Sequence, residues 1–99
     1  MLNILKTIEN GSANFALEGR LDTITAPQLE EAFKEAAPGL TALTLDFEKL
    51  EYISSAGLRV LLMAQKAMAA QGEMKLVNVG DTIQEIFEVT GFSEILTIA

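Results

Sequence analysis

The first part of the chain alternates apolar and polar residues with the two-residue period of β-strands. Leu2, Ile4 and Ile8 share one parity, and a second alternating stretch contains Phe15. The Asn10-Gly11 pair between the two stretches tolerates the positive φ angles that a tight hairpin turn requires. The pattern therefore predicts an antiparallel hairpin formed by residues 2–8 and 13–18.

A helical period follows the hairpin. Apolar residues recur at i, i+3, i+4 and i+7 in the set Leu29, Ala32, Phe33 and Ala36. Thr25 stands three residues before Gln28, which is the spacing of a capping box. Pro38-Gly39 is a stop signal, so the first helix is expected between Thr25 and this pair.

Two more helices are predicted further along. The second begins at Ser54 or Ser55 and continues to about Ala70. The third begins at Asp81, a residue type that caps helices, and ends at Gly91.

The second helix has a charged line that marks its solvent side. Arg59 and Lys66 form this line. We therefore expect Leu61 and Leu62 to face the sheet.

Strands are predicted between and after the helices, at residues 40–47, 74–79 and 95–98. The resulting order is ββαβαβαβ. Strands that alternate with helices require crossover connections and a largely parallel sheet, to which the hairpin adds an antiparallel edge. We predict an α/β fold with a mixed, mostly parallel β-sheet and packed helices, formed as a single domain over residues 1–99.

Composition excludes several classes of chemistry. The apolar share of 49% is typical of a globular domain. The chain has no cysteine and no histidine, so it lacks a thiolate nucleophile and the commonest general base and metal ligand. We expect no catalytic residues, no metal site and no cofactor.

Charge and hydropathy limit the partners. The net charge of −7 repels a phosphate backbone, and the seven basic residues are scattered, so direct nucleic-acid binding is not expected. The apolar stretch from Val60 to Ala70 is too short to insert across a membrane. Residues 1–6 lack a secretory-signal pattern, and the expected compartment is the cytoplasm.

Candidate chemistry gathers in two segments, residues 19–25 and 51–58, which are expected as loops at the carboxyl ends of strands. The second segment contains Ser54-Ser55-Ala56-Gly57 at a helix start, where free backbone N–H groups accept a phosphate, either bound or attached to serine. An ordinary serine N-cap gives the same pattern.

Two acidic residues are candidates in this region. Asp22 can orient a serine hydroxyl or repel a phosphate, and it can equally be a loop or capping residue. Asp46, expected at the end of a strand, has the same alternatives. The spacing leaves open whether the two carboxylates form an acid–base pair.

Three stretches resemble the STAS domain family of bacterial anti-sigma-factor antagonists. They are Glu18-Gly19-Arg20-Leu21-Asp22, Leu43-Thr44-Leu45-Asp46-Phe47 and Tyr52-Ile53-Ser54-Ser55-Ala56-Gly57-Leu58. The third resembles the phosphorylation loop of that family. This chain has Ser54 where the family often has Asp, and Ala56 where it often has Ser or Thr. Ala56 has no hydroxyl and cannot be a second phosphate acceptor.

The resemblance implies a protein-interaction switch and not an enzyme. Ser55 matches the phosphorylated serine, and Asp22 the loop acid near it. The unphosphorylated domain would bind an anti-sigma factor that is also a serine kinase and so release the sigma factor. Phosphorylation would separate the complex, and a serine phosphatase would reset it. The implied partner-binding residues are Asp22, Thr23, Ser54, Ser55, Ala56, Gly57 and Arg59.

Two other functions stay open. One is a non-phosphorylated STAS regulatory or scaffold subunit of a lipid-transport or sensory complex, which the departures at Ser54 and Ala56 favour. The other is a domain that binds a small anionic or nucleotide ligand at the same helix start. The lack of a glycine-rich phosphate loop counts against this last alternative.

Overall fold

The computed structural model describes residues 1–99, and the chain forms the expected mixed α/β fold. Its elements are β1 (Leu2–Glu9), β2 (Ser12–Leu21), α1 (Ala26–Ala36), β3 (Ala42–Ile53), α2 (Ser55–Ala69), β4 (Glu73–Val77), α3 (Asp81–Thr90) and a 3₁₀ turn (Phe92–Glu94).

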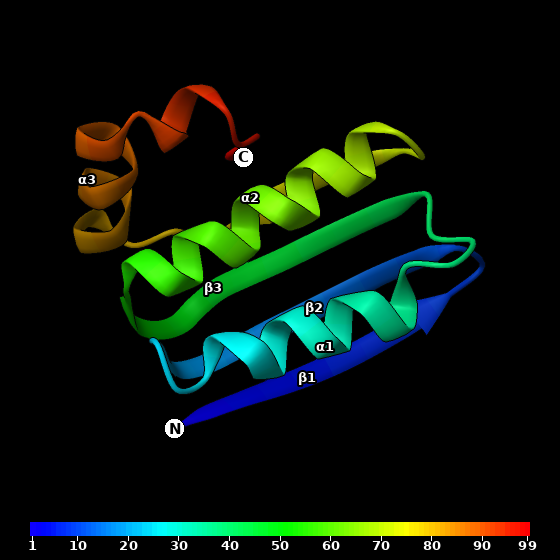
Figure 1. Cartoon of the computed structure of the whole chain (residues 1–99), viewed down its shortest axis with the longest axis horizontal. Coiled ribbons are helices and arrows are strands. Elements are labelled where there is room, and N and C mark those ends of the chain that lie inside the picture. Colours follow the sequence, from blue (N-terminus) through cyan, green and yellow to red (C-terminus); the bar gives the residue numbers. More distant parts are fainter.

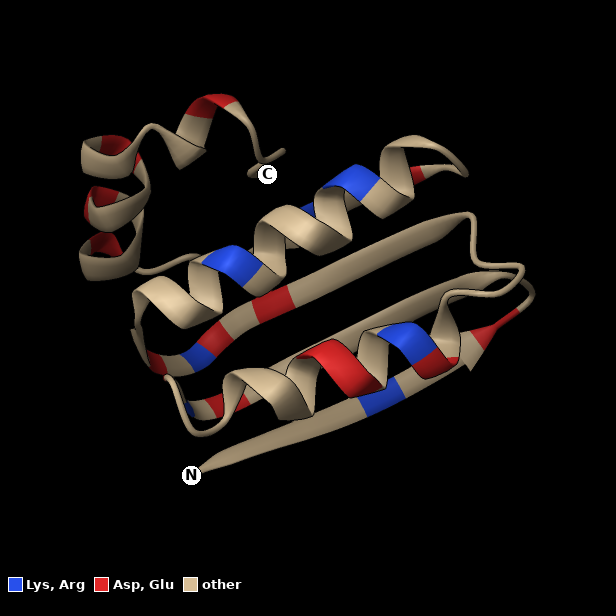
Figure 2. Cartoon of the chain, in the orientation of Figure 1, with Lys and Arg blue, Asp and Glu red and all other residues tan.

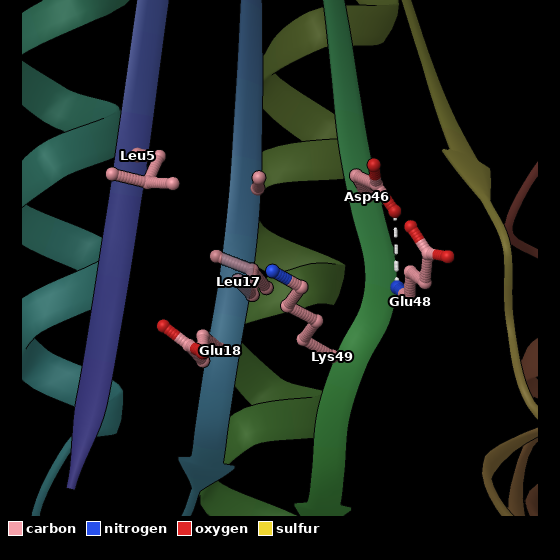
Figure 3. A pocket seen from close by; sticks show the side chains of 7 residues that line it. Leu5, Leu17, Glu18, Asp46, Glu48 and Lys49 are labelled. Carbon is pink, nitrogen blue, oxygen red and sulfur yellow. Dashed lines mark hydrogen bonds between the residues drawn. The ribbon is translucent and has the colours of Figure 1, made fainter.

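The four strands form one sheet in the order β1-β2-β3-β4. β1 is antiparallel to β2, whereas β2, β3 and β4 are mutually parallel. Figure 1 shows α1 and α2 side by side across one face of this sheet, with α3 outside that layer. The other face of the sheet has no helix over it (Figure 3).

The hairpin is confirmed. Asn10 and Gly11 form its turn with φ angles of 51° and 82°, the left-handed values that this residue pair favours. Leu2 is buried as expected, but Ile8 is 55% exposed. β1 is the edge strand, and the residues that form its hydrogen bond and ion pair with α1 are Leu2 and Lys6. Ile8 follows both residues, next to the hairpin turn, and pairs with Ala13.

The two central strands are longer than predicted. β3 was expected to end at Phe47, but it continues to Ile53, and β2 continues to Leu21. The parallel register shifts twice, and each shift places one extra residue in β3. Such bulges change which face successive side chains occupy. They explain why Leu50 is buried although it breaks the alternation of the preceding residues.

The expected capping box of α1 is absent. Thr25 precedes the helix, but its side chain makes no capping hydrogen bond. The Gln28 side chain instead donates to the backbone carbonyl of Leu2, with an N···O distance of 2.8 Å. The prediction that Asp81 caps α3 is also wrong. The N-cap of α3 is Gly80, and Asp81 lies in the first turn of the helix.

The C-terminal strand expected at residues 95–98 is reduced to one parallel bridge between Leu76 and Ile98. This bridge places the end of the chain beside β4.

The predicted end of α3 is confirmed, because Gly91 adopts a left-handed φ of 83°. None of the helices combines the length and the apolar character needed to cross a membrane.

Candidate functional site

The two segments singled out in the sequence meet at the carboxyl ends of β2 and β3. Leu21 and Ile53 are partners in the parallel register. The backbone N–H of Ser54 then donates to the carbonyl of Leu21 at 2.9 Å. Part of each segment is strand and not loop, since residues 19–21 lie in β2 and residues 51–53 lie in β3. The turn before α1 and the start of α2 therefore form one surface.

The two adjacent serines have different environments. Ser54 is half-buried, and its Oγ accepts a hydrogen bond from the backbone N–H of Gly57 at 3.4 Å, which makes it the N-cap of α2. Ser55 is the first residue of the helix, is exposed, and makes no side-chain hydrogen bond within the chain. Capping thus occupies Ser54 and leaves the hydroxyl of Ser55 free.

Gly57 sets how closely α2 approaches the sheet. A Cβ atom on this residue would lie 2.8 Å from Cγ of Leu21 and 2.9 Å from Cγ1 of Ile53. Both neighbours are buried in the core, where close packing resists their displacement. Glycine at this position therefore allows α2 to begin directly against the ends of both strands.

Asp22 organises the turn that leads into α1. Its Oδ1 atom accepts hydrogen bonds from the backbone N–H groups of Ile24 and Thr25, each at 3.0 Å. The Thr25 hydroxyl in turn donates to the carbonyl of Arg20 at 2.8 Å. The hydrogen bonds that the Asp22 carboxylate accepts from Thr25 and Ile24, led by the one from the Thr25 backbone, lower the pKa of Asp22, although partial desolvation opposes them. Asp22 forms no hydrogen bond with Ser54 or Ser55, so its charge is held in its own turn.

Arg20 and Tyr52 are site residues that the sequence analysis missed. The guanidinium of Arg20 lies over the Tyr52 ring, 4.2 Å from the centroid. Its Nε atom is also 3.8 Å from Oδ2 of Asp22. Arg20 and Tyr52 are register partners only because of the second bulge in β3. The pattern of residues within either strand therefore does not predict this pair.

A groove of about 390 Å³ extends from this end between α1 and α2. It is lined by Thr23, Ala26, Pro27, Glu30, Ala56, Arg59, Val60 and Met63. Three residues expected to bind a partner, Thr23, Ala56 and Arg59, therefore share one hollow surface. Beside it, Ile24 is 87% exposed, an apolar side chain at the tip of the turn.

Figure 2 shows how charge is arranged around this surface. The only charged residues of α2 are Arg59 and Lys66, both basic. α3 carries the acids Asp81, Glu85 and Glu88 and no basic residue. In a chain of net charge −7, α2 is thus a locally positive element.

Asp46 lies elsewhere, in a hollow of about 190 Å³ on the uncovered face of the sheet (Figure 3). Its Oδ1 atom accepts from the backbone N–H of Glu48 and from the side-chain amide of Asn78, each at 3.0 Å. Asp46 is seven residues before Ile53, or about 20 Å along the strand. The structure therefore does not bring Asp46 and Asp22 together as an acid–base pair.

Solved structures share this arrangement of elements. An anti-sigma factor antagonist from Mycobacterium paratuberculosis matches with a TM-score of 0.88 and 22% identity, covering 99% of this chain and 85% of that one. The anti-sigma factor antagonist SpoIIAA in its unphosphorylated form matches with a TM-score of 0.77 and 20% identity, covering 100% and 87%. At these identities the likeness defines the fold alone, which is that of anti-sigma factor antagonists.

Sequence relatives define the family. The profile described as "Mlab, STAS domain" matches residues 5–97. The Bordetella bronchiseptica protein named "Putative anti-sigma factor antagonist BtrV" is 40% identical over 85 residues, which are 84% of this chain and 73% of that protein. An anti-sigma-B factor antagonist of Listeria monocytogenes is 30% identical over 97 residues, covering 95% and 84%. The chain belongs to the STAS domain family.

Proposed function

We propose that this protein is an anti-sigma-factor antagonist. In its unphosphorylated state it binds an anti-sigma factor that is also a serine kinase, and so frees the sigma factor in the cytoplasm. Phosphorylation of Ser55 ends the binding, and a serine phosphatase restores it. The protein acts by binding and does no chemistry of its own.

The observation that carries this proposal is the exposed, unbonded hydroxyl of Ser55 beside a capping Ser54. A kinase must reach a serine hydroxyl without unwinding the helix behind it, and only Ser55 meets that condition here. The names of the sequence relatives support the antagonist role. SpoIIAA, which shares the fold, is described in unphosphorylated and phosphorylated forms.

The chemistry of the switch is a phosphoryl transfer from a nucleoside triphosphate held by the kinase. The Ser55 Oγ atom forms the new P–O bond, the bond to the leaving nucleoside diphosphate breaks, and the hydroxyl proton passes to a base of the kinase. The product carries about −1.5 to −2 charges at neutral pH. Burying that charge in a protein contact is costly, because its water shell is lost.

The geometry supports a contact surface that contains the residues predicted to bind the partner. We place the contact on the start of α2, the turn at Asp22 and Thr23, and the groove edge at Arg59. Ser54, Ala56 and Gly57 fix the shape of this surface, since one caps the helix, one lines the groove and one permits the close approach to the sheet.

The site is tested by mass spectrometry. Incubation with the cognate anti-sigma kinase and ATP is expected to add one phosphate, and tandem mass spectrometry is expected to locate it on Ser55. Ser55→Ala is expected to resist the reaction while Ser54→Ala accepts phosphate. Phosphate found only on Ser54 contradicts the assignment of Ser55. The absence of any phosphate, with a kinase that is active on another substrate, contradicts it as well.

The consequence for binding is tested by calorimetric titration of Ser55→Asp and Ser55→Ala against the same kinase. A carboxylate at a helix N-terminus is tolerated or favourable by about 0.3–1 kcal/mol, so Ser55→Asp is expected to fold like the parent. Its affinity is expected to fall at least about tenfold, while Ser55→Ala binds nearly as well as the parent. Equal affinities for the two variants would place residue 55 outside the interface.

A second candidate is a STAS scaffold subunit of a lipid-transport or sensory complex that is never phosphorylated. It is favoured by the matching profile, whose description names Mlab, and by Ser54 and Ala56 in the phosphorylation loop. Affinity capture from native lysate separates the two candidates. The antagonist is expected to retain an anti-sigma kinase, and the scaffold to retain transporter or sensory subunits.

A further inference from the structure

Arg59 is a cation without an anionic partner in its own chain. It is exposed on α2, forms none of the ion pairs in the structure, and its helix contains no acidic residue. The acid that shares its groove, Glu30, is already paired with Lys34 at 2.9 Å. The only other arginine, Arg20, is held between Asp22 and Tyr52.

The position of Arg59 relative to Ser55 is favourable for pairing. The two residues are four apart in one helix and so lie on the same face, about 5–6 Å apart at Cβ. Side chains in a helix lean toward its N-terminus, which directs Arg59 back toward Ser55. A negative group four residues N-terminal to a positive one is also the more stabilising order.

We propose that Arg59 is a two-position switch residue, an inference that rests on the proposed function. While Ser55 carries a free hydroxyl, the guanidinium contacts an acidic group of the anti-sigma partner at the edge of the groove. When Ser55 carries a phosphate, the guanidinium pairs with that phosphate. Phosphorylation then removes a partner contact in addition to adding charge.

The chemistry of arginine suits both positions. Its planar guanidinium binds carboxylate and phosphate oxygens in pairs, and a phosphate with two charges competes well against a carboxylate of another molecule. The partner contact is also reasonable on other grounds, because arginine is enriched among the residues that dominate interface affinity. The apolar lining of the groove, with Pro27, Val60 and Met63, provides the surrounding contact.

The intramolecular pair is tested without any kinase. Phosphoserine is incorporated at position 55 during translation, in the parent and in Arg59→Gln, and the ³¹P resonance is followed through a pH titration. A paired guanidinium stabilises the dianion, so the parent is expected to titrate about 0.3 pH unit or more below Arg59→Gln. Lys66→Gln, which removes an equal charge from the same helix, is the matched control and is expected to titrate like the parent. Equal midpoints for the parent and Arg59→Gln overturn the inference.

The partner contact is tested by calorimetric titration of the unphosphorylated proteins against the cognate anti-sigma kinase, loaded with a non-hydrolysable ATP analogue. Arg59→Gln is expected to lose about tenfold in affinity, and Lys66→Gln less than about twofold. If the parent and Arg59→Gln bind the kinase equally well, the inference is wrong and the proposed antagonist function is unaffected. A parent that does not bind the kinase overturns the proposed function and the inference with it.

Discussion

Replacing Gly57 by alanine tests the close approach of α2 to the sheet. The new methyl group would lie 2.8 Å from Cγ of Leu21 and 2.9 Å from Cγ1 of Ile53. Overpacking of a filled core costs about 1–3 kcal/mol. Alanine is favoured over glycine within a helix by about 0.5–1 kcal/mol, which offsets part of that cost. The clash is the larger effect because Leu21 is fully buried, so the net change is a destabilisation of about 1–2 kcal/mol.

The measurement is thermal and urea unfolding of the parent and Gly57→Ala. In a domain of this size the destabilisation lowers Tm by about 4–16 °C. Leu21→Ala provides the control, since it removes one of the two clashing side chains. The double variant is therefore expected to be more stable than the sum of the single effects by about 1 kcal/mol. A Gly57→Ala protein that is more stable than the parent would refute the reasoning, because helix propensity alone would then decide the result.

Other substitutions test the packing, the turn and the cap. Leu61→Ala is expected to lower the free energy of unfolding by about 2–5 kcal/mol, because Leu61 is fully buried. Leu62→Ala is expected to cost less than half of that in the same urea titration, since Leu62 is only half-buried and lies outside the core. Asp22→Asn is expected to be less stable than the parent at neutral pH. That difference should shrink in acid unfolding curves as the pH falls through and below the ordinary range of a carboxyl group, because a carboxyl with a lowered pKa stabilises the fold only while ionised. Ser54→Ala is expected to lose about 0.5–2 kcal/mol in thermal unfolding, as removal of an N-cap does.

The features that the sequence predicts well are those set by neighbouring residues. The hairpin follows from an Asn-Gly pair between alternating stretches, and the start of α2 follows from two serines before a helical pattern. Leu61 was expected to face the sheet and does, but Leu62, expected beside it, lies at the margin of the buried surface. A stripe of charged residues indicates the solvent side of a helix without showing how wide the buried side is.

The features that were missed depend on register between strands. Two extra residues in β3 place Tyr52 beside Arg20 and return Leu50 to the core. An alternation rule applied to β3 alone ends the strand at Phe47 and moves Asp46 to its end. The capping role predicted for Gln28 was wrong because of another contact between distant residues. Its side chain donates to the carbonyl of Leu2, a residue 26 positions away. Contacts of this type have no signature in a local window.

The site depends on both a contact between distant residues and a local helix cap, and Ser54 takes part in each. Ser54 is tied to β2 through the carbonyl of Leu21 and closes the first turn of α2 through Gly57. Because these bonds hold the helix start, a modification of Ser55 does not have to disturb the fold in order to change the surface. A phosphate on Ser54 would instead replace the hydroxyl that caps the helix, at a half-buried position that offers less room than the exposed Ser55. Under the proposed function, the separation of the two hydroxyls, one in the helix cap and one free, would let Ser55 be modified reversibly while the cap of α2 stays in place.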